Sequence, residues 1–399
     1  MPWSQTTPMH QKTLFIAVHL RGNRSIVELC ADYGISRKTG YRWIDRFIRR
    51  GPAGLEDRSR RPAHLPSATP PAVVDALLDL RRRHPTWGAK KLLAILKRRH
   101  ASWDLPSRST VCNVLHRHGL VRRKAQHRAI GHPGRPPSMI LAPNHVWCAD
   151  FKGQFRMGNG QYCYPLTVTD GYSRFLLGCH ALGSTAVDGA KPVFSRLFSE
   201  FGLPQYIRTD NGVPFATNTL ARLSRLSAWW VRLGILPQLI EPGNPQQNGR
   251  HERMHKTLKA EATRPPGSSM RSQQARFDRF REEFNVERPH EALDQQSPAT
   301  VYRHSARSLP STLPPLEYPD RFELRYVSAN GGIRWNNRWI NVSTVCCGEY
   351  VGLEEIDDGI WNVYFGPLKL GRLLERKMKI EDAFGRLNRH LRVSPMSLD

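Results

Sequence analysis

The sequence predicts a multidomain protein, with all-α helix-turn-helix modules first, an α/β domain in the middle and a small β-barrel towards the C-terminal end. Three observations indicate this order. Basic segments with helical periodicity and capping residues fill much of the first 121 residues. Strand-like and helical runs alternate from residue 144 onwards. Short strands with polar turns return between residues 318 and 375.

The charge of the chain indicates a polyanionic partner. Its 399 residues contain 60 Lys and Arg against 34 Asp and Glu, a formal net charge of +26. Such an excess is typical of proteins that bind nucleic acid. The competing class, basic proteins on a membrane surface, needs an apolar anchor or an amphipathic helix, and no apolar run approaches the roughly 20 residues of a membrane span. We therefore expect nucleic acid as the partner, and no membrane.

Cysteine usage and the N-terminal residues bear on the compartment. Seven cysteines, an odd number without a Cys-x-x-Cys pair, argue against both a zinc module and a disulfide framework. Residues 1–24 lack the apolar stretch and the small-residue cleavage site of a secretory signal. A reducing, cytoplasmic location fits these features best.

Residues 10–57 have the spacing of a helix-turn-helix domain. Ser25 and Glu28 form a capping box at the start of one helix, and Ser36 caps a second helix from Arg37 to Arg50. The second helix would then present four side chains to the grooves of DNA near its N-terminal end: Arg37, Lys38, Tyr41 and Arg42. An ordinary basic helical hairpin is the alternative.

Residues 71–121 have the pattern of a second module of the same kind. Helices are expected at 73–83 and 90–99, and Ser107 caps a third helix, which begins at Arg108 and is followed by Gly119. Arg108 is accordingly a further candidate for DNA contact. Two such modules in series would bind a longer DNA site than either alone.

A basic, Pro-rich linker is expected over residues 122–143. Its Gly-Arg-Pro step resembles a minor-groove hook, in which an extended arm places Arg135 in a narrow A/T groove. A plain linker, which has too few apolar side chains to build a core, explains the same residues.

Residues 144–304 are predicted to form the α/β domain. The expected strands lie at 146–151, 162–169, 173–181 and 205–209. The expected helices lie at 186–201, 220–233, 247–262 and 273–287. Three strands, a helix, a strand and then further helices indicate an α/β domain rather than a sandwich.

Residues 318–375 are expected to form the small antiparallel barrel. The expected strands lie at 322–327, 331–335, 339–342, 350–354 and 361–365. Their arginines and tryptophans would suit a DNA backbone, and tryptophans in a core are the alternative. From about residue 380 we expect a loosely ordered basic tail.

The expected helix at 247–262 carries a polar face. Helical spacing brings together Asn248, Glu252, Lys256 and Lys259, and it places Met254, Leu258 and Ala262 on the opposite side. An acid, an amide and two lysines on one face suit a metal ion beside a phosphodiester. The alternative is an exposed helix with a Glu–Lys pair one turn apart, worth about 0.3 kcal/mol.

Two further carboxylates occupy positions where a site is expected. Asp150 lies in an otherwise apolar strand, where a lone carboxylate is costly unless it is paired or binds a metal. Asp210 closes a strand, at the carboxyl end where α/β sheets place their sites. The structural alternatives are a solvent-facing acid on an edge strand and a turn residue in Asp-Asn-Gly.

Three acids are a minimal ligand set for two magnesium ions. Two such ions about 3.5–4 Å apart activate an attacking oxygen and stabilise the leaving oxygen in phosphoryl transfer. One carboxylate bridges the ions and each ion needs one more, which Asp150, Asp210 and Glu252 supply. Asn248, Lys256 and Lys259 would hold DNA beside the metals.

Three motifs together resemble those of DDE transposases with a retroviral-integrase-type catalytic core: Trp147-Cys-Ala-Asp150-Phe-Lys-Gly, Thr209-Asp210-Asn-Gly and the stretch from Pro245 to Lys259. The resemblance is strongest to bacterial insertion-sequence transposases with N-terminal helix-turn-helix modules. Phe284-Asn285, the stretch from Arg288 to Leu293, and Ser297-Pro298 are also typical of that group. The similarity extends from about residue 10 to residue 375.

The resemblance implies an RNase H-like core that nicks element ends and joins the freed 3′-hydroxyls to target DNA. It implies that Asp150, Asp210 and Glu252 are the metal-binding triad for two Mg²⁺ ions, with Mn²⁺ as a substitute, and that Lys256 and Lys259 contact DNA. It also implies double-stranded DNA partners, namely terminal inverted repeats and target DNA. A homo-oligomer is expected because two ends must be held together, and a bacterial protein of this kind is expected at the nucleoid.

The sequence departs from the family pattern in three respects. The spacing between Asp210 and Glu252 is longer than is common, Cys148 and Ala149 replace a frequent Gln-Thr pair, and the helix-turn-helix pair stands in place of the integrase zinc module. None of these changes removes one of the three acids.

Other acids and other functions fit the sequence less well. Glu241 precedes the helix and Glu261 lies on its other side, so neither is expected to be the third ligand, and Asp170 is expected to be structural. The main alternative function is a DNA-binding regulator derived from a transposase that has lost catalysis, which the three acids disfavour. A structure-specific nuclease would not need two helix-turn-helix modules.

Overall fold

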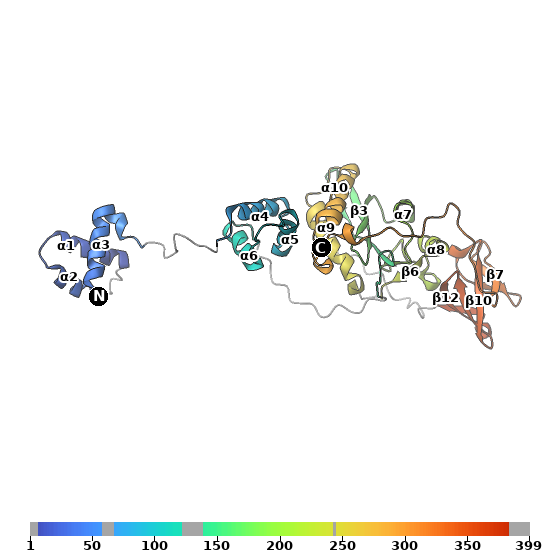
Figure 1. Ribbon diagram of the computed structural model, residues 1–399. Helices are drawn as coiled ribbons and strands as arrows, with labels where there is room; N and C mark the ends of the chain where they lie inside the picture. Colours follow the sequence, from blue (N-terminus) through green and yellow to red (C-terminus); the bar gives the residue numbers. More distant parts are fainter. Residues whose placement is uncertain (1–6, 58–67, 122–138, 242–244, 383–399) are drawn as a thin grey trace. The chain divides into compact units, whose positions relative to one another are not determined.

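The computed structural model of the protein describes residues 7–57, 68–121, 139–241 and 245–382. The chain divides into two compact units, 1–68 and 69–399, whose helices and strands are labelled in Figure 1. Arg135, the expected hook, lies outside the described residues. None of the helices in the described ranges combines the length and the hydropathy that crossing a membrane requires.

The first unit is a small helical domain. Its elements are α1 (Pro8–Leu20), α2 (Ile26–Asp32), α3 (Arg37–Arg50) and the 3-10 helix η1 (Gly51–Leu55). Ser25 forms the expected capping box with Glu28, and Ser36 accepts a hydrogen bond from the Thr39 backbone N–H. At Gly40 a Cβ atom would lie 2.5 Å from the sulfur of Cys30, so only glycine permits this approach of α3 to α2.

The second unit begins with a three-helix bundle. Its helices are α4 (Pro71–Arg83), α5 (Ala89–Arg99) and α6 (Arg108–Arg117). Ser107 caps α6 as expected, and the core contains fully buried Leu77, Trp87, Leu92 and Val111. The periodicity of the sequence therefore located this bundle to within two residues at each helix end.

The α/β domain is built on a six-stranded sheet in the order β2-β3-β1-β5-β6, in which β4 also pairs with β3. The strands are β1 (Val146–Phe151), β2 (Phe155–Arg156), β3 (Tyr162–Asp170), β4 (Leu176–Leu182), β5 (Tyr206–Thr209) and β6 (Leu236–Leu239). β1 pairs antiparallel with β3 and parallel with β5, and β5 pairs parallel with β6. Sheet and helices together confirm the predicted α/β class.

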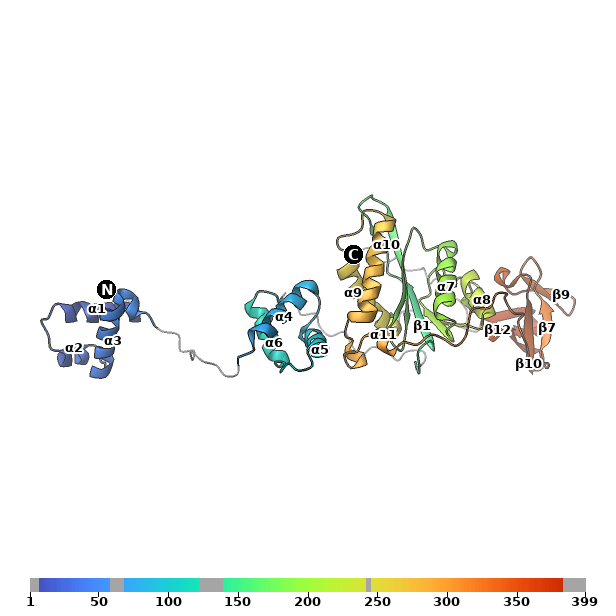
Figure 2. The ribbon, with the colours of Figure 1, turned by 45° about the horizontal axis from the view of Figure 1, so that its top comes forward.

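Helices cover both faces of this sheet (Figure 2). On one face α7 (Val187–Phe201) and α8 (Arg225–Arg232) bury Phe194 and Trp230 against Trp147 and Leu166. On the other face α9 (Gly249–Ala262) and α10 (Met270–Glu282) pack Leu258 and Phe277 against residues of β3 and β4. The expected apolar stripe of α9, Met254, Leu258 and Ala262, is buried.

Two expected helices end or break earlier than the periodicity indicated. A 3-10 turn, η2 (Leu220–Arg222), is separated from α8 because Ser224 caps α8. α10 gives way at Glu282 to a π-helical turn, η4 (Glu283–Glu287), followed by η5 (Glu291–Leu293) and α11 (Pro298–Val301). In both places capping or tertiary contact overrides a continuous helical pattern.

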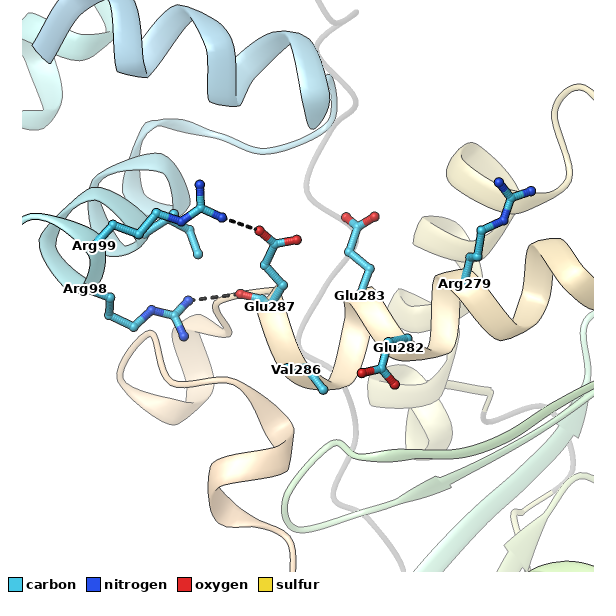
Figure 3. A pocket seen from close by; sticks show the side chains of 8 residues that line it. Arg98, Arg99, Arg279, Glu282, Glu283, Val286 and Glu287 are labelled. Carbon is cyan, nitrogen blue, oxygen red and sulfur yellow. Dashed lines mark hydrogen bonds and ion pairs between the residues drawn. The ribbon is translucent and has the colours of Figure 1, made fainter. Parts of the chain in front are cut away.

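The three-helix bundle contacts the α/β domain through this π-helical turn. The His84 imidazole lies 2.9 Å from a Glu283 carboxylate oxygen. Figure 3 shows Arg99 donating to the Glu287 carboxylate at 2.7 Å and Arg98 donating to the Glu287 carbonyl at 2.9 Å. A basic end of α5 thus faces an acidic segment of the α/β domain.

The C-terminal part is an open sheet, so the predicted small β-barrel is wrong for the described residues. Five antiparallel strands lie in the order β13-β12-β11-β10-β7, and β8 pairs only with β9. They are β7 (Glu323–Tyr326), β8 (Gly332–Trp335), β9 (Arg338–Asn341), β10 (Tyr350–Asp357), β11 (Ile360–Phe365), β12 (Leu368–Leu374) and β13 (Lys379–Asp382), with short 3-10 turns η6 (Thr344–Cys346) and η7 (Glu375–Lys377).

The physical reason is that a separate hairpin closes the core without closing the ladder. Ile333, Trp335 and Ile340 of the β8–β9 hairpin are buried together with Val351 and Leu373 of the larger sheet. Once these apolar side chains are covered, hydrogen bonding between the edge strands is not needed to exclude water. The sheet also continues to Asp382, past the expected start of a loosely ordered tail near residue 380.

Candidate active site

Asp150 lies in β1 directly opposite Thr167 of β3, and Cys148 lies opposite Thr169. Directly paired residues of an antiparallel ladder point to the same face, so Asp150 shares its face with the two threonines. Burial, followed by the charge of Asp210 and, to a smaller extent, that of Glu252, raises the pKa of Asp150 to about 8. The Lys152 ammonium and the Phe151 backbone N–H act in the opposite direction.

Asp210 directly follows β5, the parallel neighbour of β1. Its carboxylate accepts a hydrogen bond of 3.1 Å from the Gly212 backbone N–H, and burial raises its pKa. Asn211 holds the turn, because its side chain donates to the Ile240 carbonyl and accepts from Arg222. The Asp-Asn-Gly turn therefore fixes Asp210 at the carboxyl end of the sheet, as the sequence predicts.

Glu252 lies in the first turn of α9. Its side chain is exposed, while its neighbours His251 and His255 are buried. Carboxylates are favoured in the first turn by the partial positive charge of the helix N-terminus. Glu252 also contributes to the raised pKa of Asp150, so the charges of both other predicted acids act on that carboxyl.

The chemistry of these three residues fits a divalent cation. Carboxylate oxygens are the ligands that Mg²⁺ prefers, and a cation would offset the burial and like charges that raise the pKa of Asp150. In the described residues, however, no three His, Cys, Asp or Glu side chains stand in a metal-coordinating arrangement.

The remaining residues of the predicted polar face of α9 are only partly exposed to solvent. Lys256 is exposed and Lys259 half-buried, whereas Asn248 is the buried N-cap residue of α9. Its side-chain oxygen has no hydrogen-bond partner within the described residues.

Lys152 is a site residue that sequence reasoning missed. Burial and the charge of Lys259 lower the pKa of Lys152, while Asp150 and Glu252 raise it. Two lysines therefore flank the acids. Its position two residues after Asp150 was the available signal.

Two histidines of α9 were also missed. His251 and His255 contact the hydroxyl of Thr167, each through Nε2 at 2.7 Å, and His251 Nδ1 lies 2.8 Å from the Thr169 hydroxyl. Burial lowers the pKa of His251 to about 3 and that of His255 well below its ordinary value. The signal was two histidines one turn apart on either side of Glu252.

Comparison with known protein families identifies the central part of the chain. One model described as an integrase core domain matches residues 141–245, and a second with the same description matches residues 233–298. Residues 141–298 are therefore similar to an integrase core domain. Asp150, Asp210 and Glu252 all lie within this region.

The integrase core is accompanied by DNA-binding models and by insertion-element relatives. A helix-turn-helix model matches residues 14–63 and a homeodomain-like model matches 39–115. An insertion element IS407 protein of Burkholderia multivorans is 25% identical over 230 residues, covering 56% of this chain and 78% of the relative. An insertion element IS476 protein of Xanthomonas euvesicatoria is 26% identical over 252 residues, covering 62% and 69%. These matches confirm the predicted similarity to insertion-sequence transposases with an integrase-type core.

Among solved structures, the catalytic core domain of HTLV-2 integrase in complex with magnesium is similar at 15% identity. It covers 41% of this chain and 99% of the other, with a TM-score of 0.33. At that score the similarity establishes nothing beyond what the family models show.

The predicted DNA-contact residues outside the integrase core are accessible. Arg37, Lys38, Tyr41 and Arg42 are exposed in the first two turns of α3, and Arg108 is exposed at the start of α6. These five side chains are therefore accessible to a ligand from solvent.

Two of the three rival acids, Glu261 and Asp170, have other partners for their carboxylates. Glu261 forms an ion pair with Arg288, and fully buried Asp170 accepts hydrogen bonds from the Asn144 and Ser173 backbone N–H groups. Glu241 lies in the loop that follows β6, and its backbone N–H donates to the Gln247 side chain. Asp170 therefore has the structural surroundings that the sequence predicts.

Proposed function

We propose that this protein is a transposase that binds the ends of a mobile DNA element, cleaves strands there and joins the 3′-hydroxyls to target DNA. One observation carries the proposal: in a region similar to integrase core domains, the charges of Asp210 and Glu252 act on half-buried Asp150. Integrase-type and insertion-element similarity supports the same function.

In this proposal Asp150, Asp210 and Glu252 hold two magnesium ions, or manganese in their place. The ions would supply Lewis-acid activation of the attacking oxygen and stabilisation of the leaving oxygen. Lys152 and Lys259, which flank the acids, hold a phosphate of the DNA by charge. Exposed Lys256 binds the strand further along α9, and Asn248 stands at the start of that helix.

Sequence recognition is assigned to the helical modules. Arg37, Lys38, Tyr41 and Arg42 enter a groove of double-stranded DNA from α3, and Arg108 does so from α6. Arg135 is proposed as a minor-groove contact from the linker. The proposed domains are 10–57, 71–121, the linker 122–143, the catalytic core 144–304 and the C-terminal sheet domain 318–375.

A homo-oligomer is part of the proposal, because two terminal inverted repeats must be held together for joining. The alternative is a catalytically inactive regulator that binds the same DNA. The presence of all three acids, with Asp150 held at a raised pKa by its surroundings, favours the enzyme.

The test uses linear DNA that carries the flanks of the protein's own gene, incubated with Mg²⁺ or Mn²⁺. Wild type is compared with Glu252→Gln and with Glu282→Gln, which changes an exposed glutamate of the same domain. We expect metal-dependent nicking at the ends and joining for wild type and for Glu282→Gln. Glu252→Gln should bind the ends and leave them uncut.

Each other outcome has a defined meaning. Tight end binding without cleavage by any variant supports the regulator and rejects the transposase. Cleavage without preference for ends indicates a nuclease. Joining by Glu252→Gln at the wild-type rate removes Glu252 from the triad.

A further inference from the structure

The hydroxyl of Thr167 is the centre of a buried polar cluster between α9 and the sheet. It donates to the Asp150 carbonyl at 3.1 Å, and it contacts Nε2 of both His251 and His255 at 2.7 Å. Thr167 is fully buried, and the two rings are 1% and 5% exposed. His255 also lies 3.7 Å from the Asp150 carboxylate through Nδ1.

The hydrogen atoms of this cluster can be assigned from its contacts. A threonine hydroxyl has one hydrogen to donate and two lone pairs to accept. Since the hydrogen goes to the Asp150 carbonyl, both histidines donate from Nε2 to Thr167. His251 Nδ1 then accepts from the Thr169 hydroxyl. Every hydrogen-bonding position of Thr167 is filled, which requires both rings in their observed places.

Apolar packing alone does not fix the position of α9 along its own axis. Its buried stripe is Met254, Leu258 and Ala262, with a repeat of four residues. A slide by four residues, about 6 Å at a rise of about 1.5 Å per residue, would place one apolar residue where another had been. Glu252 and Lys256 are also four residues apart, so the same slide would exchange the third acid for a lysine.

We propose that Thr167, with His251 and His255, is a positioning device that selects the one register of α9 in which Glu252, and not Lys256, faces Asp150. This inference rests on the proposed function of the three acids. Either histidine alone would tolerate the slide, because the other would take its place. The pair bound to one hydroxyl does not, since a slide leaves Gln247 or Lys259 opposite Thr167.

The test compares Thr167→Val, which keeps the shape and removes the hydroxyl, with Thr167→Ser, which restores it. Thr263→Val is the matched control: it removes another buried hydroxyl of the same region, which donates to the Lys259 carbonyl at the end of α9. Thr169→Val removes only the outer bond to His251 and serves as a milder variant should Thr167→Val not fold.

Three quantities separate positioning from a general loss of structure. For Thr167→Val we expect end-DNA binding within about twofold of wild type, a single-turnover cleavage rate lower by about tenfold or more, and a half-saturating Mn²⁺ concentration raised by a similar factor. Thr167→Ser should recover most of the rate. Thr263→Val should change thermal stability without changing metal dependence.

The outcomes also separate this inference from the proposed function. If wild type cleaves no DNA, the transposase proposal fails, and the Mn²⁺-induced rise in melting temperature still measures whether Thr167→Val weakens metal binding. If Thr167→Val matches Thr263→Val in both rate and Mn²⁺ dependence, the positioning role is overturned. The positioning role is also overturned if Thr167→Ser does not restore the cleavage rate and the Mn²⁺ dependence that Thr167→Val lost.

Discussion

Arg288 donates to both carboxylate oxygens of Glu261, at 2.8 and 3.0 Å. Both side chains are largely buried, at 9% and 18% exposure. This pair connects the C-terminal part of α9 to the segment after η4. It also gives an ion-pair partner to Glu261, the acid of α9 that was the alternative to Glu252. Both bonds come from one guanidinium nitrogen, Nη1, and hydrogen bonds between charged groups are stronger than those between neutral ones.

Arg288→Met should leave Glu261 unpaired and partly buried. We expect a loss of about 2–3 kcal/mol in the free energy of unfolding, measured by urea denaturation. Glu261→Gln should keep metal-dependent cleavage, because this acid is not part of the proposed triad. Abolished cleavage in a folded Glu261→Gln variant would contradict the assignment of Glu252.

Asp150→Asn should make the metal-free protein more stable while abolishing cleavage. Burial, followed by the charges of Asp210 and Glu252, raises the pKa of the wild-type carboxyl to about 8, and an amide has no charge to which these effects apply. We expect a gain of about 1–3 kcal/mol at neutral pH, seen as a higher melting temperature without metal. Asp278→Asn, at an acid of α10, is the control. Equal stabilisation by both variants would refute burial and repulsion at Asp150 as the cause.

His180 should make the integrase core sensitive to acid. Burial, followed by the charges of Arg196 and Arg281, lowers the pKa of His180 to about 4, whereas the unfolded chain binds this proton near pH 6.5. The folded state is therefore favoured above that pH, and this contribution is lost as the pH falls from about 6.5 towards 4. When the pH falls from about 7 to about 5, the free energy of unfolding should decrease by about 1–2 kcal/mol less for His180→Leu than for wild type. If urea denaturation shows the same decrease in stability for both proteins, His180 is not the cause of the acid sensitivity.

Charge reversal at Glu287 should loosen the three-helix bundle from the integrase core. Glu287 accepts from Arg99 through its side chain and from Arg98 through its carbonyl. Glu287→Lys should increase the radius of gyration in X-ray scattering at low salt, and the double change with Arg99→Glu should reverse most of the increase. Because the pair is about a third exposed, its interaction is worth only about 0.5–1 kcal/mol. An unchanged scattering curve would show that other contacts hold the bundle.

Arg42→Gln should weaken DNA binding mainly through the phosphate charge. Exposed in the second turn of α3, Arg42 is expected to release about one counterion, so the salt slope of binding should fall by about 1. Arg24→Gln is the matched control, because Arg24 is paired with Asp32 outside α3. A fall in slope as large for Arg24→Gln would remove the special role of Arg42.

Local signals predicted much of the secondary structure. Ser25, Ser36 and Ser107 start their helices at the expected positions, since caps act on adjacent backbone N–H groups. β1 has the expected bounds because its residues are apolar on both faces. In the proposed site, Asp150 was predicted as a lone acid in an apolar strand, Asp210 from its place at a strand end and Glu252 from a helix face.

Features that depend on distant partners were not predictable. The break at Ser224 and the π-helical turn after Glu282 interrupt continuous helical patterns. The open C-terminal sheet depends on how the β8–β9 hairpin covers its core. The roles of His251 and His255 follow only from the sheet residue they meet, Thr167, which lies more than eighty residues away in sequence.

Asp150 is carried by the sheet, and Glu252 by the helical layer that covers one of its faces. Trp147 and Ala149 of β1 pack with α7 and α8, whereas α9 packs with α10 on the opposite face, to which Asp150 points. Layers with separate apolar clusters can open separately, as cooperative subunits of one domain. Local unfolding of α9 and α10 would therefore remove Glu252 from the proposed triad. DNA cleavage would then stop while the sheet itself is still folded.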